Sequence, residues 1–536
     1  MNRKKFILES LALSAMPGLL QQCRMAGKHV IRGQISGANS TIGHLLRDPA
    51  VTGRKPEEII ETGTLVVGGG VSGLSAARRL LQQGRKDFIL IELDKQPGGN
   101  AACGSNEVSA YPYGAHYIPL PNNELTAYLQ FLEECGVITG YDAVGLPLIN
   151  EMYLCFDPQE RLYIHGYWQE GIIPAFGLPD SELQQVKRFL EEMEGFRKAK
   201  GADGKEAFSI PVDSSSSDAQ FVQLDRISMH DWLLQHNYNA PGLHWYINYC
   251  CRDDFGTDYR QASAWAGIHY FAGRKGLAAN AAPQSVITWP EGNGWLVQQM
   301  QKKIAPYILP GTVALNVDTT GEGVTVKVLE VATKRIKSIH AKTCILATPQ
   351  FVNSRLLAAD DARKKTIADH FVYQPWMVAN ITSRKLTERS GAGLSWDNVL
   401  YKGRGLGYVE ATHQLIGHQG PKQVLTYYLP LTEKKAAEER AAAQKRSFED
   451  WVSLIREDLL AAHPDFDEMA DQVDVWVWGH GMISPHINFI HGAVRKQMQQ
   501  PLAGKVYFAH SDLSGISVFE EAFYQGLKAA DAVLQA

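Results

Sequence analysis

The feature that most constrains the fold is a glycine-rich segment, Gly68 to Gly73, placed between two contrasting patterns. Residues 64–67 are a short apolar run typical of a buried strand, and residues 74–83 predict a helix rich in Ala, Leu and Arg. A second apolar run over 88–91 ends in Glu92. Strand, glycine turn, helix, strand and acid in this order are the signature of a dinucleotide-binding βαβ unit.

Each glycine of the motif has a physical purpose. Gly68 makes the tight turn, Gly70 lets a pyrophosphate approach the backbone, and Gly73 lets helix and strand pack closely. The N-terminus of the helix offers free N–H groups and the positive end of a dipole. Glu92 is placed to accept hydrogen bonds from ribose hydroxyls. A glycine turn without a ligand is the alternative, and the complete frame disfavours it.

The rest of the chain has to build further structure, because 536 residues are too many for one core. The net charge of −4 leaves no broad basic field, so nucleic acid is not an expected partner. The seven cysteines include no C-x-x-C and no zinc-like spacing, so neither a structural metal nor a disulfide framework is expected. Strand-like runs over 313–317, 324–328 and 343–347 lie far from the glycine motif, which indicates interleaved domains.

The N-terminus has the order of an export signal. Residues 1–5 are basic and residues 6–20 are mostly apolar. The basic part resembles a twin-arginine signal, and Leu20 to Cys23 resembles a lipoprotein cleavage box, with Cys23 as the candidate lipid anchor. We therefore expect a signal over 1–23, a spacer over 24–60, and a periplasmic or membrane-anchored protein. An uncleaved leader on a cytoplasmic protein is the alternative.

Further segments resemble the flavin-containing amine oxidases and the phytoene desaturases. The second glycine pair, Gly98-Gly99, is followed by Asn100 where those families usually have Arg. Residues 110–117 resemble the next element, a turn beside the flavin ring. There His116 is a candidate flavin-facing and catalytic residue, or a histidine that bonds the backbone in a packed turn. In the predicted strand over 313–317, Ala314 resembles the residue that meets the adenine, and a shift of one would select Val313.

The last forty residues carry the second half of the resemblance. The run from Val506 to Asp512 reads as a strand and a turn, and Asp512 matches the acid that binds the ribityl and diphosphate region in these families. A helix begins near residues 517–520, where its N–H groups would face the flavin. Ser517 and Glu521 replace two expected glycines.

The resemblance implies an α/β protein of the glutathione-reductase type. A Rossmann-like FAD-binding domain (61–120, 290–365 and 495–536) is interleaved with an α+β substrate domain (121–289 and 366–494). It implies non-covalent FAD, held by Gly68, Gly70, Val71, Ser72, Gly73, Glu92, Leu93, Gly99, Asn100, Gly114, Ala115, His116, Tyr117, Ala314, Asp512, Ser517, Val518 and Phe519.

The resemblance further implies an oxidoreductase that moves a hydride from a substrate C–H bond, expected to be that of an amine, to flavin N5. O₂ or another acceptor would reoxidise the flavin. Besides His116, the candidate bases are His480 and His486. Trp476, Trp478 and Tyr524 are candidates for lining the pocket or filling the core. A desaturase of polyenes, a flavin-binding accessory protein and an NAD-dependent dehydrogenase are the alternatives.

Overall fold

The computed structural model describes residues 29–319, 321–357, 359–417 and 420–536. The predicted export signal and its candidate lipid-anchor residue, Cys23, lie outside these ranges and stay predictions. Within them, no helix combines the length and the apolar character needed to cross a membrane, and no cluster of His, Cys, Asp or Glu has the makings of a metal site.

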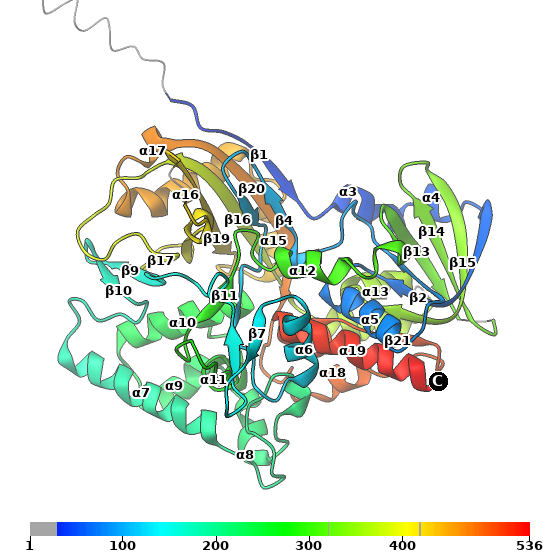
Figure 1. The fold of residues 1–536 in the computed structure, drawn as a ribbon, viewed down its shortest axis with the longest axis horizontal. Coiled ribbons are helices and arrows are strands. Elements are labelled where there is room, and N and C mark those ends of the chain that lie inside the picture. The colour runs from blue at the N-terminus through cyan, green and yellow to red at the C-terminus, as the bar shows by residue number, and fades with distance from the viewer. Residues whose placement is uncertain (1–28, 320, 358, 418–419) are drawn as a thin grey trace, which may run out of the picture.

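One lobe is built on a seven-stranded sheet (Figure 1). Its order is β12 (Ile308–Leu309), β3 (Phe88–Ile91), β2 (Glu58–Val67), β15 (Arg335–Leu346), β14 (Val324–Glu330) and β13 (Thr312–Asp318), with β21 (Val506–Phe508) paired to β15. Strands β3, β2, β15 and β21 are parallel, as in a Rossmann-like sheet. The three predicted strands of the middle segment correspond to β13, β14 and the end of β15.

Two helices from opposite ends of the chain lie side by side in this lobe. They are α5 (Val71–Gln82) and α19 (Phe519–Gln535). They approach closely at Gly526, where a Cβ atom would lie 2.2 Å from the Ser72 carbonyl oxygen. Segments 450 residues apart in the sequence therefore form one end of the same lobe, as the interleaved domains predicted.

The second lobe is built on an eight-stranded mixed sheet. Its order is β1 (Arg32–Gly37), β20 (Ala470–Ile483), β16 (Tyr373–Arg384), β19 (Lys422–Pro430), β18 (Gly407–Glu410), β17 (Asp397–Leu400), β9 (Glu160–Ile164) and β10 (Tyr167–Glu170). Side chains of β16, β19 and β20 share a hydrophobic core with α16 (Phe448–Ala462), around the fully buried Trp451.

A helical region completes this lobe (Figure 1). It contains α7 (Asp180–Lys198), α9 (Met229–Gln235), α10 (Pro241–Phe255) and α11 (Ala264–Ala272). The sequence Ser228-x-x-Asp231 predicts a helix start, and α9 begins there: the Ser228 side chain accepts a 3.0 Å hydrogen bond from the Asp231 N–H.

Two predicted loop regions have more structure than the sequence indicated. Residues 32–37, within the predicted spacer, form β1, an exposed edge strand paired with β20. Its partner lies some 440 residues away, so local patterning carries no sign of it. The Ser-rich stretch 213–218, which its composition predicts to be a surface loop, buries Ser215 and Ser216, while Asp213, Ser214 and Ser217 are exposed. Its surroundings are supplied by the distant C-terminal segment.

Candidate functional site

The glycine motif forms a tight turn, the glycine cradle, in which Gly68 and Gly73 cannot carry ordinary side chains. Gly68 has φ +104°, and a Cβ on Gly73 would lie 1.9 Å from the Gly68 carbonyl oxygen. Gly70 is the N-cap of α5 and provides no side-chain cap, so the first N–H groups of the helix are left for another acceptor. The motif therefore has the geometry of an anion-binding helix N-terminus.

The second glycine pair lies against the first. Gly98 donates its N–H to the Gly69 carbonyl at 3.0 Å. Gly99 has φ +55°, and a Cβ there would come within 3.3 Å of the Gly70 Cα. Two bare backbones thus meet beside the start of α5, which leaves space that a phosphate group fits and a side chain would fill.

The acid that ends the second strand closes this cradle. The Glu92 carboxylate accepts hydrogen bonds from the Gly69 N–H at 2.6 Å and the Asp94 N–H at 2.8 Å. Burial raises its pKa to about 7, against these hydrogen bonds, which lower it. Leu93, which follows Glu92, packs against the cluster that includes Val313 and Leu315 of β13, and Ala314 lies between these two residues in the strand. The role of these residues at the adenosine end of a cofactor stays a prediction.

The turn after β5 (Ala110–Pro112) connects this cradle to the second sheet. Its Gly114 carbonyl accepts a 3.0 Å hydrogen bond from the Tyr428 hydroxyl, and the Ala115 N–H donates to the Asn100 carbonyl at 3.3 Å. The Asn100 side chain donates to the Gly481 carbonyl of β20. Asn100 therefore joins two lobes with its amide, where the resemblance implies a charged arginine.

His116 lies among aromatic rings. Its ring centroid is 4.6 Å from that of Tyr428, 5.1 Å from Tyr117 and 5.6 Å from Trp396. Burial lowers its pKa to about 4, so the imidazole is neutral near pH 7. Nδ1 is 3.4 Å from the Gly114 carbonyl. Both roles predicted for His116 are therefore compatible with this position.

A group of carboxyls lies beside these rings and was not predicted from the sequence. Asp253 and Asp254 are in the last turn of α10, and Asp397 begins β17. Asp254 pairs with Arg274. Asp253 has no hydrogen-bond or ion-pair partner among the described residues and is only partly buried.

The pKa values of Asp253 and Asp397 are raised by burial and by the neighbouring acids. Burial raises the pKa of Asp253 to about 7, and the neighbouring Asp254 charge adds to the effect. Burial also raises the pKa of Asp397 well above its ordinary value, with further repulsion from Asp253 and Glu160. A signal was present in the sequence, because two acids at a helix C-terminus oppose the helix dipole.

Asp512 is held on β21's exit turn, almost fully buried. Its carboxylate accepts from the Tyr373 hydroxyl at 2.6 Å and the Gln350 N–H at 2.9 Å, and lies 2.9 Å from His510 Nδ1. Burial would raise its pKa, but the His510 charge and these hydrogen bonds lower it. The adjacent Gln350 side chain is fully buried, and its amide oxygen and nitrogen have no hydrogen-bond partner among the residues that the structure describes. Such an orphaned amide fits a site completed by a ligand.

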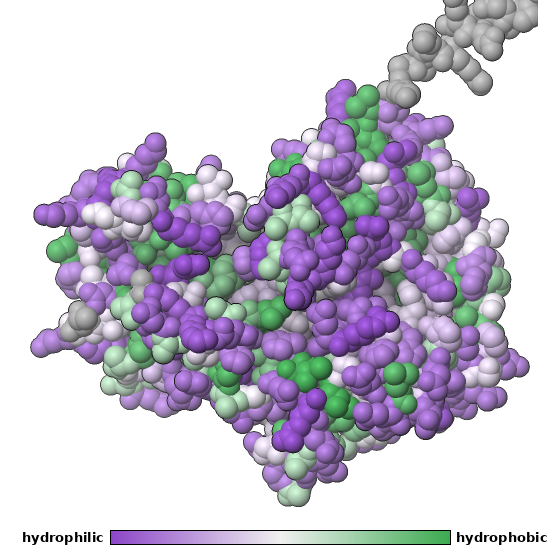
Figure 2. Space-filling view, turned by 180° about the vertical axis from the view of Figure 1, so that it is seen from behind, coloured by the Kyte–Doolittle hydropathy of each residue, from purple (hydrophilic) through white to green (hydrophobic). Residues whose placement is uncertain are grey.

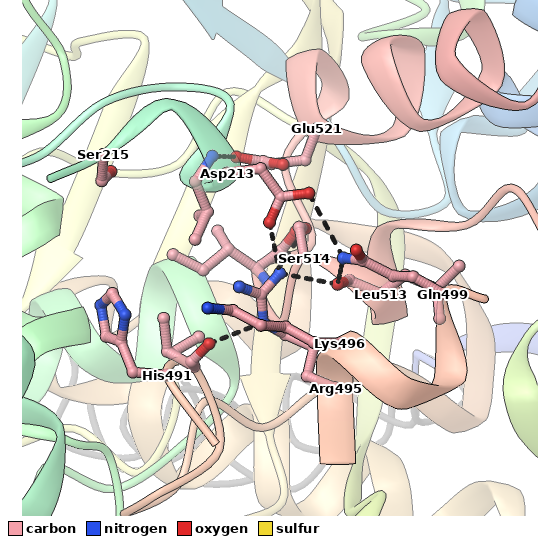
Figure 3. A network of polar contacts seen from close by, with 12 residues as sticks. Asp213, Ser215, His491, Arg495, Lys496, Gln499, Leu513, Ser514 and Glu521 are labelled. Atoms are coloured by element: carbon pink, nitrogen blue, oxygen red, sulfur yellow. Dashed lines mark hydrogen bonds and ion pairs between the residues drawn. The ribbon is translucent and has the colours of Figure 1, made fainter. Parts of the chain in front are cut away.

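The start of α19 is uncapped. Val518 is its N-cap and provides no side-chain bond; Ser517 and Val518 are half-buried and Phe519 is buried. Figure 3 shows how Glu521 fixes this end: it accepts the Val212 N–H at 2.6 Å. Burial raises its pKa to about 8. Glu521 stands where the resemblance implies a glycine, and its carboxylate attaches the first turn of α19 to Val212, next to the Ser-rich stretch.

The other residues predicted as bases or pocket-lining groups make stacking contacts or hydrogen bonds within the protein. His480 stacks on Phe351 at 4.0 Å, and burial lowers its pKa to about 3. His486 bonds the Ser484 carbonyl. Trp478 donates to the Tyr113 carbonyl and Trp476 stacks on Tyr113. Tyr524 packs beside Phe523 on α19.

Comparison with known proteins also indicates a Rossmann-like nucleotide-binding domain. A family model described as an NAD(P)-binding Rossmann-like domain matches residues 66–132. A flavin-containing amine oxidase of Oncorhynchus mykiss is 25% identical over 310 residues, 54% of this chain and 51% of that protein. The chain thus spans about half the length of the curated relative it matches.

Solved structures match over most of the chain. Putrescine oxidase with bound putrescine has a TM-score of 0.65 at 15% identity, covering 89% of this chain and 100% of its own. Cyclohexylamine oxidase from Brevibacterium oxydans IH-35A has a TM-score of 0.62 at 14% identity, covering 88% and 99%. A CLA-producing fatty acid isomerase from P. acnes has a TM-score of 0.59 at 13% identity, covering 88% of this chain and 98% of its own.

The chain therefore has the two-domain fold of amine-oxidase-type flavoproteins, with a Rossmann-like nucleotide-binding domain. This confirms the predicted fold class.

Proposed function

We propose that this protein is an FAD-dependent oxidoreductase of the amine-oxidase type that acts on cationic amines. The observation that carries the proposal is the meeting of His116, Tyr428 and Trp396 with the carboxyls Asp253 and Asp397. Tyr428 belongs to both groups, because its raised pKa reflects burial first and then the charges of these two acids.

FAD fits the residues at the nucleotide end. The uncapped α5 N-terminus with Gly70, Val71 and Ser72 would receive the diphosphate, and Glu92 the ribose. The uncapped start of α19, with Ser517, Val518 and Phe519, would face the flavin ring. Gly114 and Tyr117 would border the ring, and Asp512 the ribityl chain. When bound, FAD supplies the acceptor for a hydride from the substrate C–H bond.

The carboxyls supply what an amine needs before oxidation. An amine with a pKa near ~10 arrives as an ammonium ion and has to lose a proton. Burial raises the pKa of Asp253 to about 7, and this carboxyl has no hydrogen-bond or ion-pair partner among the described residues. An ammonium ion beside Asp253 favours the carboxylate form, which burial disfavours, and the low-polarity surroundings lower the pKa of the amine itself, so that its proton is lost more easily before oxidation. The aromatic rings then hold the neutral amine away from water.

The same features argue against a polyene substrate. A hydrocarbon placed beside the partly buried carboxyls of Asp253 and Asp397 would offer them no polar partner, whereas an ammonium ion would. The fatty acid isomerase shares the fold, so the fold alone does not select a substrate. The carboxyls make the selection in favour of a cation.

An oxygen-consumption screen of the purified protein tests the proposal. Monoamines, diamines, amino acids, polyenes and fatty acids are compared at equal concentration. We expect oxygen uptake with amines, faster for those with a second cationic group, and none with polyenes. Uptake with polyenes and none with any amine would contradict the assignment.

Glu92 gives this proposal a pH dependence. Its pKa of about 7 lies above the ordinary 4.5, so the carboxyl gains a proton as the pH falls through 7 and loses its capacity as a double acceptor for ribose hydroxyls. FAD affinity is therefore expected to rise with pH through about 7 and to level off above it. Fluorescence titration with FAD across this range measures it, and Glu92→Gln should remove the inflection. An unchanged inflection in Glu92→Gln would exclude Glu92 as its source.

A further inference from the structure

The N-terminal segment 32–52 joins the two lobes across a recess. Figure 1 shows β1 on the second sheet and the short helices that follow it on the nucleotide-binding lobe, and Figure 2 shows a hollow in the surface between the lobes. After β1 come α3 (Ser40–Gly43), the 3₁₀ turn η2 (His44–Arg47) and α4 (Pro49–Thr52). We call residues 32–52 the N-terminal clasp.

Both ends of the clasp are firmly attached. The β1 strand pairs with β20 from Arg32 to Gly37. On the other lobe, the Asn39 amide donates to the Asp94 carboxylate at 3.1 Å, two residues after Glu92. Apolar side chains of the clasp pack against this lobe; they are Ile42, Leu45, Leu46 and Val51, in contact with a cluster that includes Leu93, Val313 and Leu315. The clasp therefore covers the adenosine end of the nucleotide site.

The clasp also places Arg47 near Asn100, where the resemblance implies an arginine and its positive charge is missing. Arg47 and His44 are close enough to His480 to lower its pKa by their charge, as is Arg440. His480 precedes Gly481, whose carbonyl receives the Asn100 amide. Arg440 donates to the Gly479 carbonyl at 3.0 Å. Arg47 and Arg440 therefore act on the segment Gly479 to Gly481, which also holds Asn100, the residue found where the resemblance implies an arginine.

Arg47 is free to serve a ligand. It is exposed and has no hydrogen-bond or ion-pair partner in the described part of the chain. The adjacent Asp48 carboxylate is occupied, because it caps α4 by accepting the Ala50 N–H at 2.9 Å. Asp512, whose charge also acts on His480, already accepts hydrogen bonds from Tyr373 and Gln350 and lies beside His510.

We propose that the N-terminal clasp is part of the FAD site and that Arg47, assisted by Arg440, neutralises the diphosphate in place of the arginine that Asn100 has replaced. The inference rests on the proposed function, since it assigns residues to the same cofactor. A guanidinium contributes a long-range charge and a planar set of donors to a phosphate oxygen. The cofactor is then held from both lobes without a covalent bond.

The test measures FAD release, without turnover. Holoprotein carrying Arg47→Gln is diluted and the released FAD is followed by its fluorescence, at low and at high ionic strength. We expect the dissociation constant to rise about tenfold at low salt, as the loss of one charged hydrogen bond predicts. The difference from wild type should shrink at high salt, since the charge is screened. Asn100→Arg in the Arg47→Gln background should restore binding.

Arg54→Gln is the matched control. Arg54 is exposed, follows the clasp directly, and pairs with Glu57 at 3.1 Å and the Lys334 carbonyl. It should bind FAD as wild type does. An Arg47→Gln protein with wild-type affinity, or with a loss that salt does not alter, would overturn the role of Arg47 while leaving the proposed function intact. A wild-type protein that takes up no flavin would overturn both.

Discussion

Replacing Gly73 by alanine is expected to yield protein without flavin. The added Cβ would stand 1.9 Å from the Gly68 carbonyl oxygen, and a backbone atom cannot give way as a flexible side chain does. Either α5 moves away from β2, which opens the cradle, or the fold pays an overpacking cost of about 1–3 kcal/mol or more. Both outcomes separate the α5 N-terminus from the phosphate position. The flavin-to-protein absorbance ratio after purification and the thermal midpoint measure the two effects.

Gly195→Ala is the control for this substitution. Gly195 lies inside α7, and a Cβ there would meet nothing within 4 Å. Because alanine favours a helix over glycine by about 0.5–1 kcal/mol, this variant should be as stable as wild type or slightly more so. It should keep its flavin. Full flavin content in Gly73→Ala would show that the glycine cradle does not hold the cofactor.

Replacing Asp253 and Asp397 by asparagine is expected to raise KM for amines about tenfold to hundredfold. The substitution keeps the shape of each side chain and removes the carboxyl that would ionise and pair with a bound ammonium group, and a hydrogen bond to a charged group is worth about 1.5–3 kcal/mol. In wild type, kcat/KM should rise with pH through about 7, where Asp253 loses its proton. In Asp253→Asn this inflection should disappear. Steady-state oxygen uptake over a pH series measures both quantities.

Asp258→Asn provides the comparison. Asp258 follows α10 and pairs with the exposed Arg260 at 3.5 Å. It should leave KM and the pH profile unchanged. If Asp253→Asn and Asp397→Asn oxidise amines with wild-type KM, the carboxyls do not recognise the substrate, and the case for a cationic amine loses its main support.

The local part of the fold could be predicted from the sequence. The glycine turn, β2, α5, β3 and Glu92 occupy a stretch of 35 residues from Glu58 to Glu92, in which every requirement is a neighbour in the chain. The strand β21 and helix α19 were also predicted, because both have regular patterns. These elements position the nucleotide end of the site, and the fold class inferred from them is confirmed.

The substrate end could not be assembled in this way. His116, Asp253, Asp397 and Tyr428 come from a turn, a helix end and two strands, and only the folded chain brings them together. The β1 strand was missed for the same reason, since its pairing with β20 is non-local and its side chains are mostly exposed. The periodicity of hydrophobic residues indicates which face of an element is buried, but it does not indicate which distant element packs against that face.

The central claim is that this protein binds FAD and reduces it with electrons from an amine. The most direct measurement is an anaerobic titration of the holoprotein with a diamine, followed by the visible absorption of the flavin. The account predicts flavin bands in the purified protein, their loss on adding the amine, and their return when oxygen is admitted. A bound flavin whose bands persist with every amine, and that is reduced by a chemical reductant, would contradict it and indicate a flavin-binding protein without amine turnover.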